Sequence, residues 1–201
     1  MTAHATPRFT AWGRALAAVV MAVFALVATT TAAGAATGQA GPASHPGFRA
    51  QAKDLGLNGS QARTLQDRVD GYLATTDGTQ VAVNKIALKS GGQLLLALPG
   101  EERAREVSPA GADRLAAIAC PYTYVCAYSG TDFTGDVFML YTCDRLTPIS
   151  WTGTGSWINN QNSTLHARFY NSAGNVGWTS PGGYSEDRAA PWGWVYWLSP
   201  C

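Results

Sequence analysis

Three hydrophobic patterns follow one another along the chain. Residues 15–28 form a continuous apolar run, residues 62–73 carry apolar side chains at three- and four-residue spacing, and short apolar runs separated by glycine-containing turns follow residue 120. A continuous run is typical of a targeting or membrane segment. Spacing of three and four residues is typical of an amphipathic helix, and short divided runs are typical of β-strands. The pattern predicts an apolar leader, a small α+β segment and an all-β C-terminal domain.

The apolar leader has the layout of a secretory signal peptide. Arg8 and Arg14 precede the run, and small residues up to Ala35 follow it. The run has about 14 residues, fewer than the roughly 20 that a membrane-spanning helix needs, so an uncleaved anchor is the less favoured alternative. We expect a signal peptide at residues 1–35, cleavage before Ala36, and a secreted, extracellular protein that leaves the membrane.

The small α+β segment is expected at residues 52–107, after a flexible leader at 36–51 rich in Gly, Ala, Pro and Ser. Asn58 can cap a helix, with the side chain of Gln61 reaching back to it. The apolar positions of this one helix are Ala62, Leu65, Val69, Tyr72 and Leu73.

A β-hairpin is expected after the helix. Its strands are predicted at 81–88 and 94–98, around a turn at Ser90, Gly91 and Gly92. One helix and one hairpin are too small to be stable alone, so this segment should pack on something else. We expect a linker at 108–117.

The C-terminal domain is expected at residues 118–201. No lysine follows Cys120, and six of the 7 tryptophans lie between Trp151 and Trp197. Strands are predicted at 124–128, 137–141, 164–170 and 192–198. In the third of these, Leu165, Ala167 and Phe169 should face the core while His166 and Arg168 face water.

The four cysteines indicate two disulfides, because their number is even and the chain is predicted to be exported. They are Cys120, Cys126, Cys143 and Cys201. Three pairings are possible, and the short gap between the first two favours joining them, which leaves Cys143 for Cys201. The latter bridge would contribute roughly 3–5 kcal/mol. A zinc site is disfavoured because the Cys-x-x-Cys spacing is missing and only His166 is near.

One motif of the β region combines aromatic residues with a glycine. Tyr128 is followed by Phe133 and then Gly135. A glycine can take the positive φ that folds a hairpin back over its sheet, and the two rings can then cover the corner.

The motif returns in weaker form at Tyr170 and Gly177, with Asn175 at the aromatic position. The repeat suggests two similar Greek-key units.

These residues resemble two related groups of proteins. The aromatic and glycine spacing, with the turn at 159–164, is similar to that of the βγ-crystallin family. The run from Cys120 to Gly135, Cys143, residues 156–160 and Cys201 resemble secreted actinobacterial peptidase inhibitors of the Streptomyces metalloproteinase-inhibitor type. The resemblance covers residues 118–201.

The resemblance implies a βγ-crystallin-like Greek-key sandwich with two disulfides, for which the pairs above are suitable. It also implies a monomeric inhibitor that inserts a rigid loop into the cleft of an extracellular metalloproteinase. The turns at 129–136 and 174–183 are the candidate loops. The helix and hairpin lie outside the inhibitor domain, and their role stays open.

Calcium is a further possibility, because crystallin-type turns can bind it. Asn159, Asn160 and Ser163 offer suitable oxygen atoms. These side chains are uncharged, Thr164 replaces the usual final serine, and no equivalent turn follows the second unit. A structural turn is therefore favoured over a weak calcium site, and no other cofactor is expected.

The tryptophans support alternative functions. Most should fill the core, but Trp178 and Trp192 lie beside Gly or Pro in predicted loops, where they could contact a partner. One alternative is therefore a crystallin-type antimicrobial protein, or one that binds a glycan or cell surface. Another is a calcium-stabilised stress protein.

Charge and motifs argue against several other classes. Removing residues 1–35 takes two of 14 basic and none of 13 acidic residues, which leaves a net charge of −1. Nucleic acid and anionic membranes are thus poor partners. The β domain offers only His166 as a catalytic base, and no phosphate-binding loop is present, so we expect no enzyme. Its carboxylates are those expected of surface turns: Asp132, Asp136, Asp144, Glu186 and Asp187.

Overall fold

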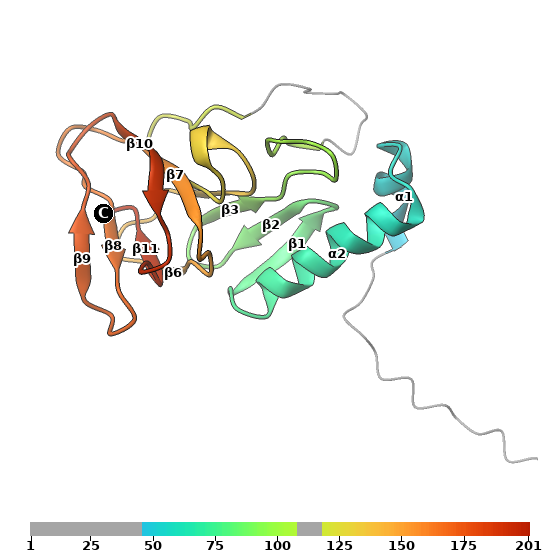
Figure 1. The fold of residues 1–201 in the computed structure, drawn as a ribbon, viewed down its shortest axis with the longest axis horizontal. Helices are drawn as coiled ribbons and strands as arrows, with labels where there is room; N and C mark the ends of the chain where they lie inside the picture. Colours follow the sequence, from blue (N-terminus) through green and yellow to red (C-terminus); the bar gives the residue numbers. More distant parts are fainter. Residues whose placement is uncertain (1–45, 108–117) are drawn as a thin grey trace, which may run out of the picture. The chain divides into compact units, whose positions relative to one another are not determined.

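The computed structural model describes residues 46–107 and 118–201 (Figure 1). They belong to one compact unit, residues 40–201. Two helices, a short 3₁₀ turn and two antiparallel sheets of 7 and 4 strands make up the described part. The predicted signal peptide, most of the leader and the linker at 108–117 lie outside it. Neither described helix is long and apolar enough to cross a membrane.

Helix α2 (Gly59–Leu73) is the predicted helix, and Asn58 caps it. The side-chain oxygen of Asn58 accepts the backbone N–H of Gln61 at 3.0 Å, and the side-chain oxygen of Gln61 accepts that of Asn58 at 2.9 Å. These bonds satisfy amide groups that have no partner within the helix. Leu65 and Val69 are fully buried, so one face of α2 packs on the core.

A second helix, α1 (Pro46–Asp54), was not expected. The prediction of a flexible leader up to residue 51 is wrong for its last six residues, which are helical. Ala52 is only 2% exposed and Phe48 packs against the core, so this short helix buries apolar surface. The side chain of Gln51 also accepts the N–H of Val83 at 2.8 Å. Tertiary contacts stabilise a helix that its own sequence only weakly favours.

Three strands form where a hairpin was predicted, because the run 81–88 is interrupted by a turn. Asn84 in that turn is fully buried, and its amide group donates to the carbonyls of Leu96 at 2.8 Å and Arg105 at 2.9 Å. The turn predicted at 90–92 lies between the second and third strands, except that Gly92 already belongs to the third, and the strand predicted at 94–98 is found at Gly92–Leu95. The strands are β1 (Gly78–Ala82), β2 (Lys85–Leu88) and β3 (Gly92–Leu95).

The N-terminal strands continue the sheet of the C-terminal region. Strand β3 pairs with β5 (Val137–Leu140), with Leu94 opposite Phe138. The larger sheet has the order β1-β2-β3-β5-β4-β7-β10. The segment therefore packs by adding strands to a sheet edge, which removes the unpaired edge that β5 would otherwise present.

The C-terminal strands form two units of four, β4–β7 and β8–β11. The third strand of each unit hydrogen-bonds in the other unit's sheet: β10 lies beside β7, and β6 beside β11 in the order β6-β11-β8-β9. The elements are β4 (Tyr124–Tyr128), η1 (Thr131–Phe133), β6 (Thr147–Pro148), β7 (Thr154–Asn160), β8 (Arg168–Tyr170), β9 (Val176–Thr179), β10 (Ser185–Pro191) and β11 (Trp197–Ser199).

The strand predicted at 164–170 is shortened to β8. Ala167 and Phe169 are buried and His166 is exposed, as predicted. Leu165 and Arg168 are both half-buried, so their predicted contrast is lost. A turn precedes the strand because the N–H of Leu165 bonds to the carbonyl of residue 162.

The strand predicted at 192–198 is wrong for its first half. Residues 192–195 form a turn, in which the N–H of Val195 donates to the carbonyl of Trp192 at 2.9 Å. Strand β11 therefore begins only at Trp197. The strand predicted at 124–128 is confirmed, and that at 137–141 ends one residue earlier.

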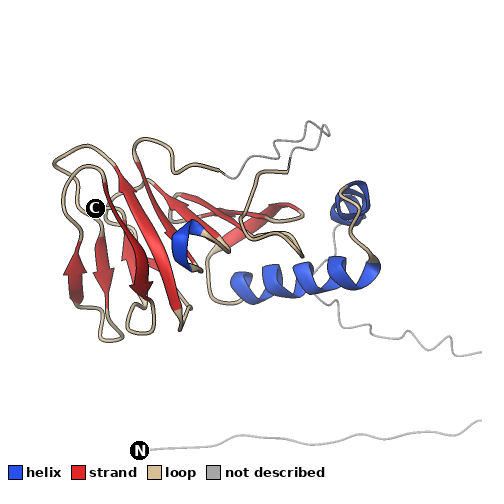
Figure 2. Ribbon diagram, turned by 45° about the horizontal axis from the view of Figure 1, so that its top comes forward, coloured by secondary structure: helices blue, strands red, loops and turns tan. Residues whose placement is uncertain are grey.

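One face of the larger sheet carries the main core. Leu65 of α2 and Phe169 and Leu198 of the smaller sheet belong to the same buried cluster. The other face has a smaller cluster around Cys126 and Met139. Figure 2 shows the helices beside the strands of the larger sheet and the smaller sheet near its other end. Helix α2 and the smaller sheet thus together cover one face of the larger sheet.

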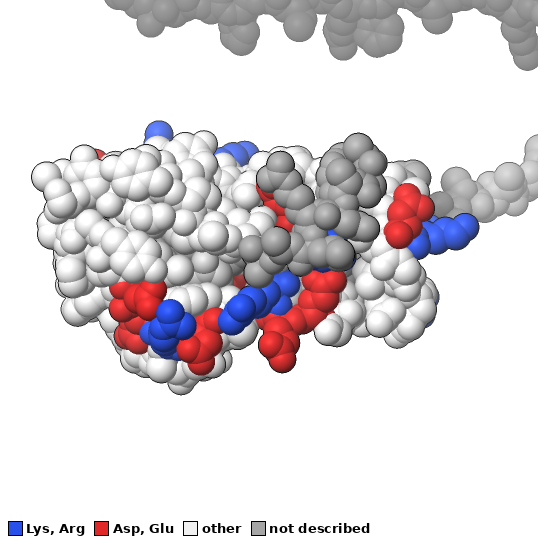
Figure 3. Space-filling view, turned by 90° about the horizontal axis from the view of Figure 1, so that it is seen from above, with Lys and Arg blue, Asp and Glu red and all other residues white. Residues whose placement is uncertain are grey.

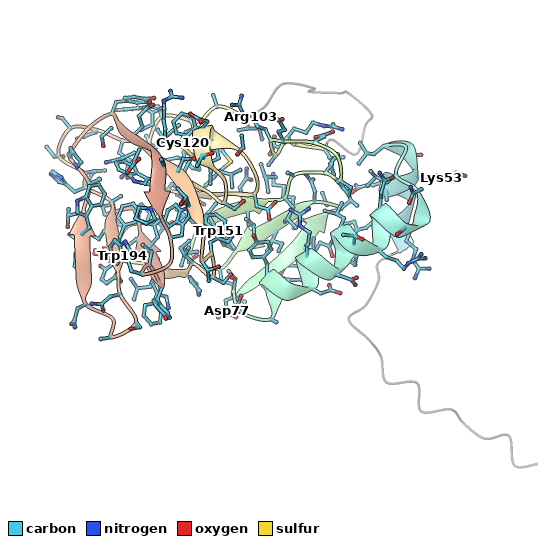
Figure 4. All side chains as sticks on the ribbon, viewed as in Figure 1. Lys53, Asp77, Arg103, Cys120, Trp151 and Trp194 are labelled. Carbon is cyan, nitrogen blue, oxygen red and sulfur yellow. A yellow bond between two sulfur atoms is a disulfide. The ribbon has the colours of Figure 1, made fainter. Side chains whose placement is uncertain are left out.

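A buried carboxylate connects these layers. Asp136 is 5% exposed, pairs with Arg68, and accepts the N–H of Ala97 at 2.9 Å and the hydroxyl of Tyr72 at 2.8 Å. The indole N–H of Trp151 donates to the Tyr72 oxygen at 2.8 Å, and Figure 4 marks Trp151 among the side chains of this core. Burial, aided by the Asp136 charge, raises the pKa of Tyr72 well above its usual value.

Candidate functional site

Both disulfides are present, in the pairing that the cysteine spacing favoured. Cys120 is bonded to Cys126, with their Cα atoms 5.8 Å apart. Cys143 is bonded to Cys201, 58 residues away, and ties the C-terminus to the segment after β5. The described cysteines contain no free thiol. These bridges stiffen two surface loops of the β region.

The first corner, residues 129–136, has the geometry that its aromatic and glycine residues predicted. The rings of Tyr128 and Phe133 have centroids 5.4 Å apart, and Gly135 has a φ of 79°. A Cβ on Gly135 would lie 2.2 Å from the hydroxyl oxygen of Ser129, which accepts the N–H of Asp136. Only glycine fits at this point.

The tip of the first corner is held against the sheet. The N–H of Phe133 donates to the hydroxyl of Ser156 at 2.9 Å, and the guanidinium of Arg188 lies 4.6 Å from the Phe133 ring centre. Arg103 also donates to the carbonyl of Asp132 at 2.9 Å. Since the tip's groups already have partners within the protein, this corner is a poor candidate for insertion into a cleft.

The second corner, residues 171–177, departs from the predicted repeat. The positive φ belongs to Gly174, at 76°, and Gly177 lies in β9 instead. Asn175 is exposed where the first corner has an aromatic ring. A Cβ on Gly177 would lie 2.4 Å from the ring of Trp194. The expectation that Gly177 matches Gly135 is therefore wrong; its role is to let a tryptophan approach the strand.

Residues 180–184 connect β9 to β10, and we name them the edge loop. Its start is hydrogen-bonded from beneath by Asn159, which is fully buried in β7. The Asn159 amide donates to the hydroxyl of Ser180 at 3.1 Å and to the carbonyl of Pro181 at 3.2 Å. A ring nitrogen of His166 lies 2.9 Å from the Ser180 carbonyl oxygen. The start of the loop is thus fixed by contacts with the side chains of Asn159 and His166.

The far side of the edge loop faces solvent. Pro181 is exposed, and Tyr184 is 64% exposed. The hydroxyl of Tyr184 donates to Glu186 at 2.5 Å, which raises the pKa of Tyr184 and lowers that of Glu186. The edge loop therefore combines a fixed base with a projecting apolar surface. It overlaps the candidate loop at 174–183 and extends one residue beyond it.

The residues considered for calcium have separate partners. The side-chain oxygen of Asn159 accepts the amide of Gln161 at 2.9 Å, and the amide of Asn160 donates to the carbonyl of Cys120 at 2.9 Å. Ser163 is exposed. Within the ranges 46–107 and 118–201, no group of three or more His, Cys, Asp or Glu residues could hold a metal ion.

A second exposed loop, residues 143–146, was not identified from the sequence. Cys143 is tethered by its disulfide, and the N–H of Asp144 donates to the carbonyl of Cys201 at 3.2 Å. Arg145 is exposed, and Leu146 is 47% exposed. An apolar residue close to a disulfide-bonded cysteine was the signal that could have found it.

The tryptophans line a pocket between the edge strands β9 and β10. Trp192 is buried, 1% exposed, so the expectation that it lies accessible in a loop is wrong. Trp178 is 40% exposed and Trp194 is 37% exposed. With Trp157 and Phe169 they line a cavity of about 380 Å³, the tryptophan pocket. Figure 4 labels Trp194 near β8.

Charged side chains gather elsewhere. Arg188 pairs with Glu186 at 2.9 Å and lies 3.6 Å from Asp132. Figure 3 shows acidic and basic side chains next to one another along one margin, while the left-hand end is almost uncharged. These opposite charges form ion pairs and so neutralise each other locally.

Most carboxylates considered for catalysis have a cationic partner. Asp136 pairs with Arg68, Asp144 pairs with Arg168, and Asp132 and Glu186 share Arg188. Asp187 instead accepts the backbone N–H of Ala189. The expectation of a surface carboxylate is wrong for Asp136, which is buried in a structural ion pair.

Comparison with known protein families gives a match to part of the chain. Residues 114–180 match the model of peptidase inhibitor family I36, about a third of the chain. No curated protein and no solved structure matches. The matched residues include the first corner, β7, the second corner and the beginning of the edge loop.

Proposed function

We propose that this protein is a secreted inhibitor of an extracellular peptidase, with a metallopeptidase as its first candidate target. The match to a peptidase inhibitor family over residues 114–180 supports inhibition in general. The predicted signal peptide supports export, and a mature chain beginning at Ala36 would be its product.

The edge loop is the part that we propose enters the peptidase cleft. The observation that carries this proposal is the fully buried Asn159, whose amide holds Ser180 and Pro181 while Tyr184 projects into solvent. A loop fixed before binding loses little conformational entropy when it binds. The first corner is also fixed, but its tip offers less to a cleft because its polar groups are already bonded to Ser156 and Arg103.

We further propose that the C-terminal region has the crystallin-like Greek-key fold. Two features support this proposal: each four-strand unit gives its third strand to the other sheet, and Tyr128, Phe133 and Gly135 form the folded corner. The N-terminal strands are then an extension of one crystallin-like sheet.

Inhibition is tested by titrating a thermolysin-type metallopeptidase with the purified secreted chain, with a serine peptidase run in parallel. We expect stoichiometric loss of metallopeptidase activity only. Loss of serine peptidase activity alone would contradict the metallopeptidase target. Full activity of both enzymes at large molar excess would contradict inhibition of these classes.

The edge loop is tested with a matched pair of variants. Tyr184→Ala removes a side chain that is 64% exposed on this loop, and Tyr122→Ala removes one equally exposed in the Cys120–Cys126 loop. We expect Tyr184→Ala to weaken inhibition about tenfold to a hundredfold, since a well-placed interface aromatic contributes about 2 kcal/mol or more. Tyr122→Ala should inhibit normally. Equal inhibition by both variants would contradict insertion of the edge loop.

For the turn at Asn159, Asn160 and Ser163 we propose a structural role without calcium. The oxygen of Asn159 already accepts a hydrogen bond from Gln161, which supports this proposal. Thermal melts in chelator and in millimolar calcium should coincide, because a ligand that binds the folded state would raise the melting temperature. A higher melting temperature in calcium would show that the turn binds the ion.

A further inference from the structure

The tryptophan pocket has a composition that the proposed inhibition does not use. Three of its aromatic residues form its floor: Trp157, Phe169 and Trp192, each no more than 5% exposed. Trp178 and Trp194 form more exposed walls. The ring of Trp178 lies 5.2 Å from that of Trp157 and 5.1 Å from that of Phe169. The cavity between them measures about 380 Å³.

The walls are positioned by the backbone of β9. Trp178 is paired with Phe169 across β8 and β9, so its side chain projects from the same face of the sheet. Gly177, the neighbouring residue, leaves room for the ring of Trp194, which a Cβ would meet at 2.4 Å. Glycine at this position therefore keeps the second wall close to the strand.

Among the described residues that line the pocket, Asp187 is the only one with an ionisable side chain. It lies opposite Trp157 in the pairing of β10 with β7, so both side chains project from the same face of the sheet. One carboxylate oxygen accepts the N–H of Ala189 at 2.9 Å. Among the residues that the structure describes, none forms an ion pair with Asp187.

The nearest basic residue along β10 is directed elsewhere. Arg188 pairs with Glu186 and lies over the ring of Phe133, which belongs to the other face of the larger sheet. The pairing of β10 with β7 is irregular between Asp187 and Ala190. A bulge can redirect side chains in this way. The carboxylate at the pocket therefore keeps its charge available to a ligand.

We propose that the tryptophan pocket binds the alkylammonium head of an organic cation, such as choline or a lysine side chain. Tryptophan faces attract cations through their quadrupole, and the attraction is stronger where water is excluded. Asp187 adds a negative charge, and none of the described lining residues is basic.

A sugar suits the pocket less well than a cation. Sugar hydroxyls require several placed polar partners, whereas the lining side chains provide one acceptor group, the Asp187 carboxylate, besides the indole N–H donors of the tryptophans. The indole N–H of Trp192 is already donated to the carbonyl of Tyr128 at 2.8 Å, so it is unavailable. This proposal is independent of peptidase inhibition, because the edge loop and the pocket could act separately.

The test titrates the purified chain with choline, n-butylammonium and the neutral isostere 3,3-dimethyl-1-butanol, at constant ionic strength. Binding is followed by tryptophan fluorescence and by isothermal calorimetry. We expect at least one cation to bind about tenfold more tightly than the isostere, the discrimination that cation–π contacts and the Asp187 carboxylate supply together. The better of the two cations then distinguishes a quaternary ammonium from a lysine-like ligand.

Two variants and a control make the test specific. Asp187→Asn retains an oxygen for the N–H of Ala189 and should weaken cation binding about tenfold while leaving the isostere unchanged. Trp194→Leu should weaken cation binding too. Tyr196→Ala, 48% exposed and outside the pocket lining, should bind like the unmodified chain.

Three results would overturn the proposal. One is equal affinity for choline, butylammonium and the neutral isostere, which would mean that the pocket is only apolar. Another is binding of methyl glycosides or N-acetylglucosamine without binding of either cation. The third is cation binding that is unchanged in Asp187→Asn and in Trp194→Leu. Thermal melts of each variant show that a loss of binding is not a loss of folding.

Discussion

The first and second corners occupy the same place in their four-strand units but are built differently. In the first, Phe133 covers the fold, and Gly135 supplies the positive φ. In the second, Asn175 is exposed at the aromatic position, and the positive φ has moved to Gly174. One corner is sealed by its own side chains, whereas the other leaves aromatic surface open beside it.

The difference shows how two four-strand units of similar topology can serve different purposes, one unit stability and the other binding. A sealed corner buries aromatic surface and gains from it, but presents little to a ligand. In the second unit Gly177 allows Trp194 to lie against β9, and together with Trp178 it borders a pocket. The second unit therefore gives up a covered corner and gains a concave apolar site, the kind that ligands favour.

The largest expected effect comes from removing Asp136, the buried carboxylate that anchors the end of the first corner. Asp136→Ala removes the acceptor for Ala97, Tyr72 and Arg68 and leaves buried donors without partners. We expect the free energy of unfolding to fall by about 3–5 kcal/mol, as when one partner of a buried ion pair is lost. Urea unfolding measures the change.

Asp132→Ala is the control for this experiment, because Asp132 lies in the same corner but is exposed. It loses a weak surface ion pair to Arg188 and, at a φ of 52°, aspartate's better tolerance of the left-handed region, so its stability should change by about 1 kcal/mol or less. If the two variants were equally stable, the buried carboxylate would not be the anchor of this corner.

A smaller effect distinguishes Gly135 and Gly174, the positive-φ glycines of the two corners. Alanine at Gly135 has both an unfavourable φ and a close approach to Ser129, so we expect a loss of about 2–4 kcal/mol. Alanine at Gly174 meets no atom within 4 Å and should cost about 1 kcal/mol, the backbone strain alone. Equal losses in urea unfolding would mean that the first corner is no more tightly packed than the second.

The features that could be predicted from sequence are those fixed by local chemistry. Asn58 and Gln61 form the helix cap because their side chains reach backbone groups a few residues away. Gly135 and Phe133 form the first corner for a similar reason. The short gap between Cys120 and Cys126 favoured their pairing, and the other pair followed from it.

The features that were missed depend on contacts between distant residues. Strand β10 begins Ser185-Glu186-Asp187-Arg188, a polar run whose strand conformation comes from backbone pairing with β7. The pairing of β3 with β5 joins residues more than 40 positions apart. Asn84, a turn-forming residue, is buried because it bonds to Leu96 and Arg105. No periodicity in the sequence reports such partners.

The candidate site was predictable only in outline. The range 174–183 was identified as a loop, but its rigidity comes from Asn159, which the sequence assigned to a possible calcium turn. Trp192 was expected to be accessible, yet its indole N–H is bonded within the core to Tyr128. In both cases a polar group's partner, which sequence spacing does not identify, determines what the residue does.

The smallest effect, absent at neutral pH, is expected in alkali. Burial, together with the nearby Tyr184, raises the pKa of Tyr128 to about 12 against the opposing charge of Arg103. In the unfolded chain a tyrosine loses its proton near pH 10. The contribution of Tyr128 to the free energy of unfolding is therefore complete below about pH 10. It is lost as the pH rises from about 10 to 12, because the unfolded state releases the proton first.

Tyr128→Phe isolates this contribution, because the phenylalanine ring can still cover the first corner. We expect the variant to resemble the unmodified protein at pH 7 and to lose less stability between about pH 10 and 12. Urea unfolding across that range measures both slopes. Parallel slopes would show that Tyr128 does not contribute to the alkaline loss. Any loss that persists in the variant points to Tyr72, whose pKa burial also raises and which bonds to the same anchor, Asp136.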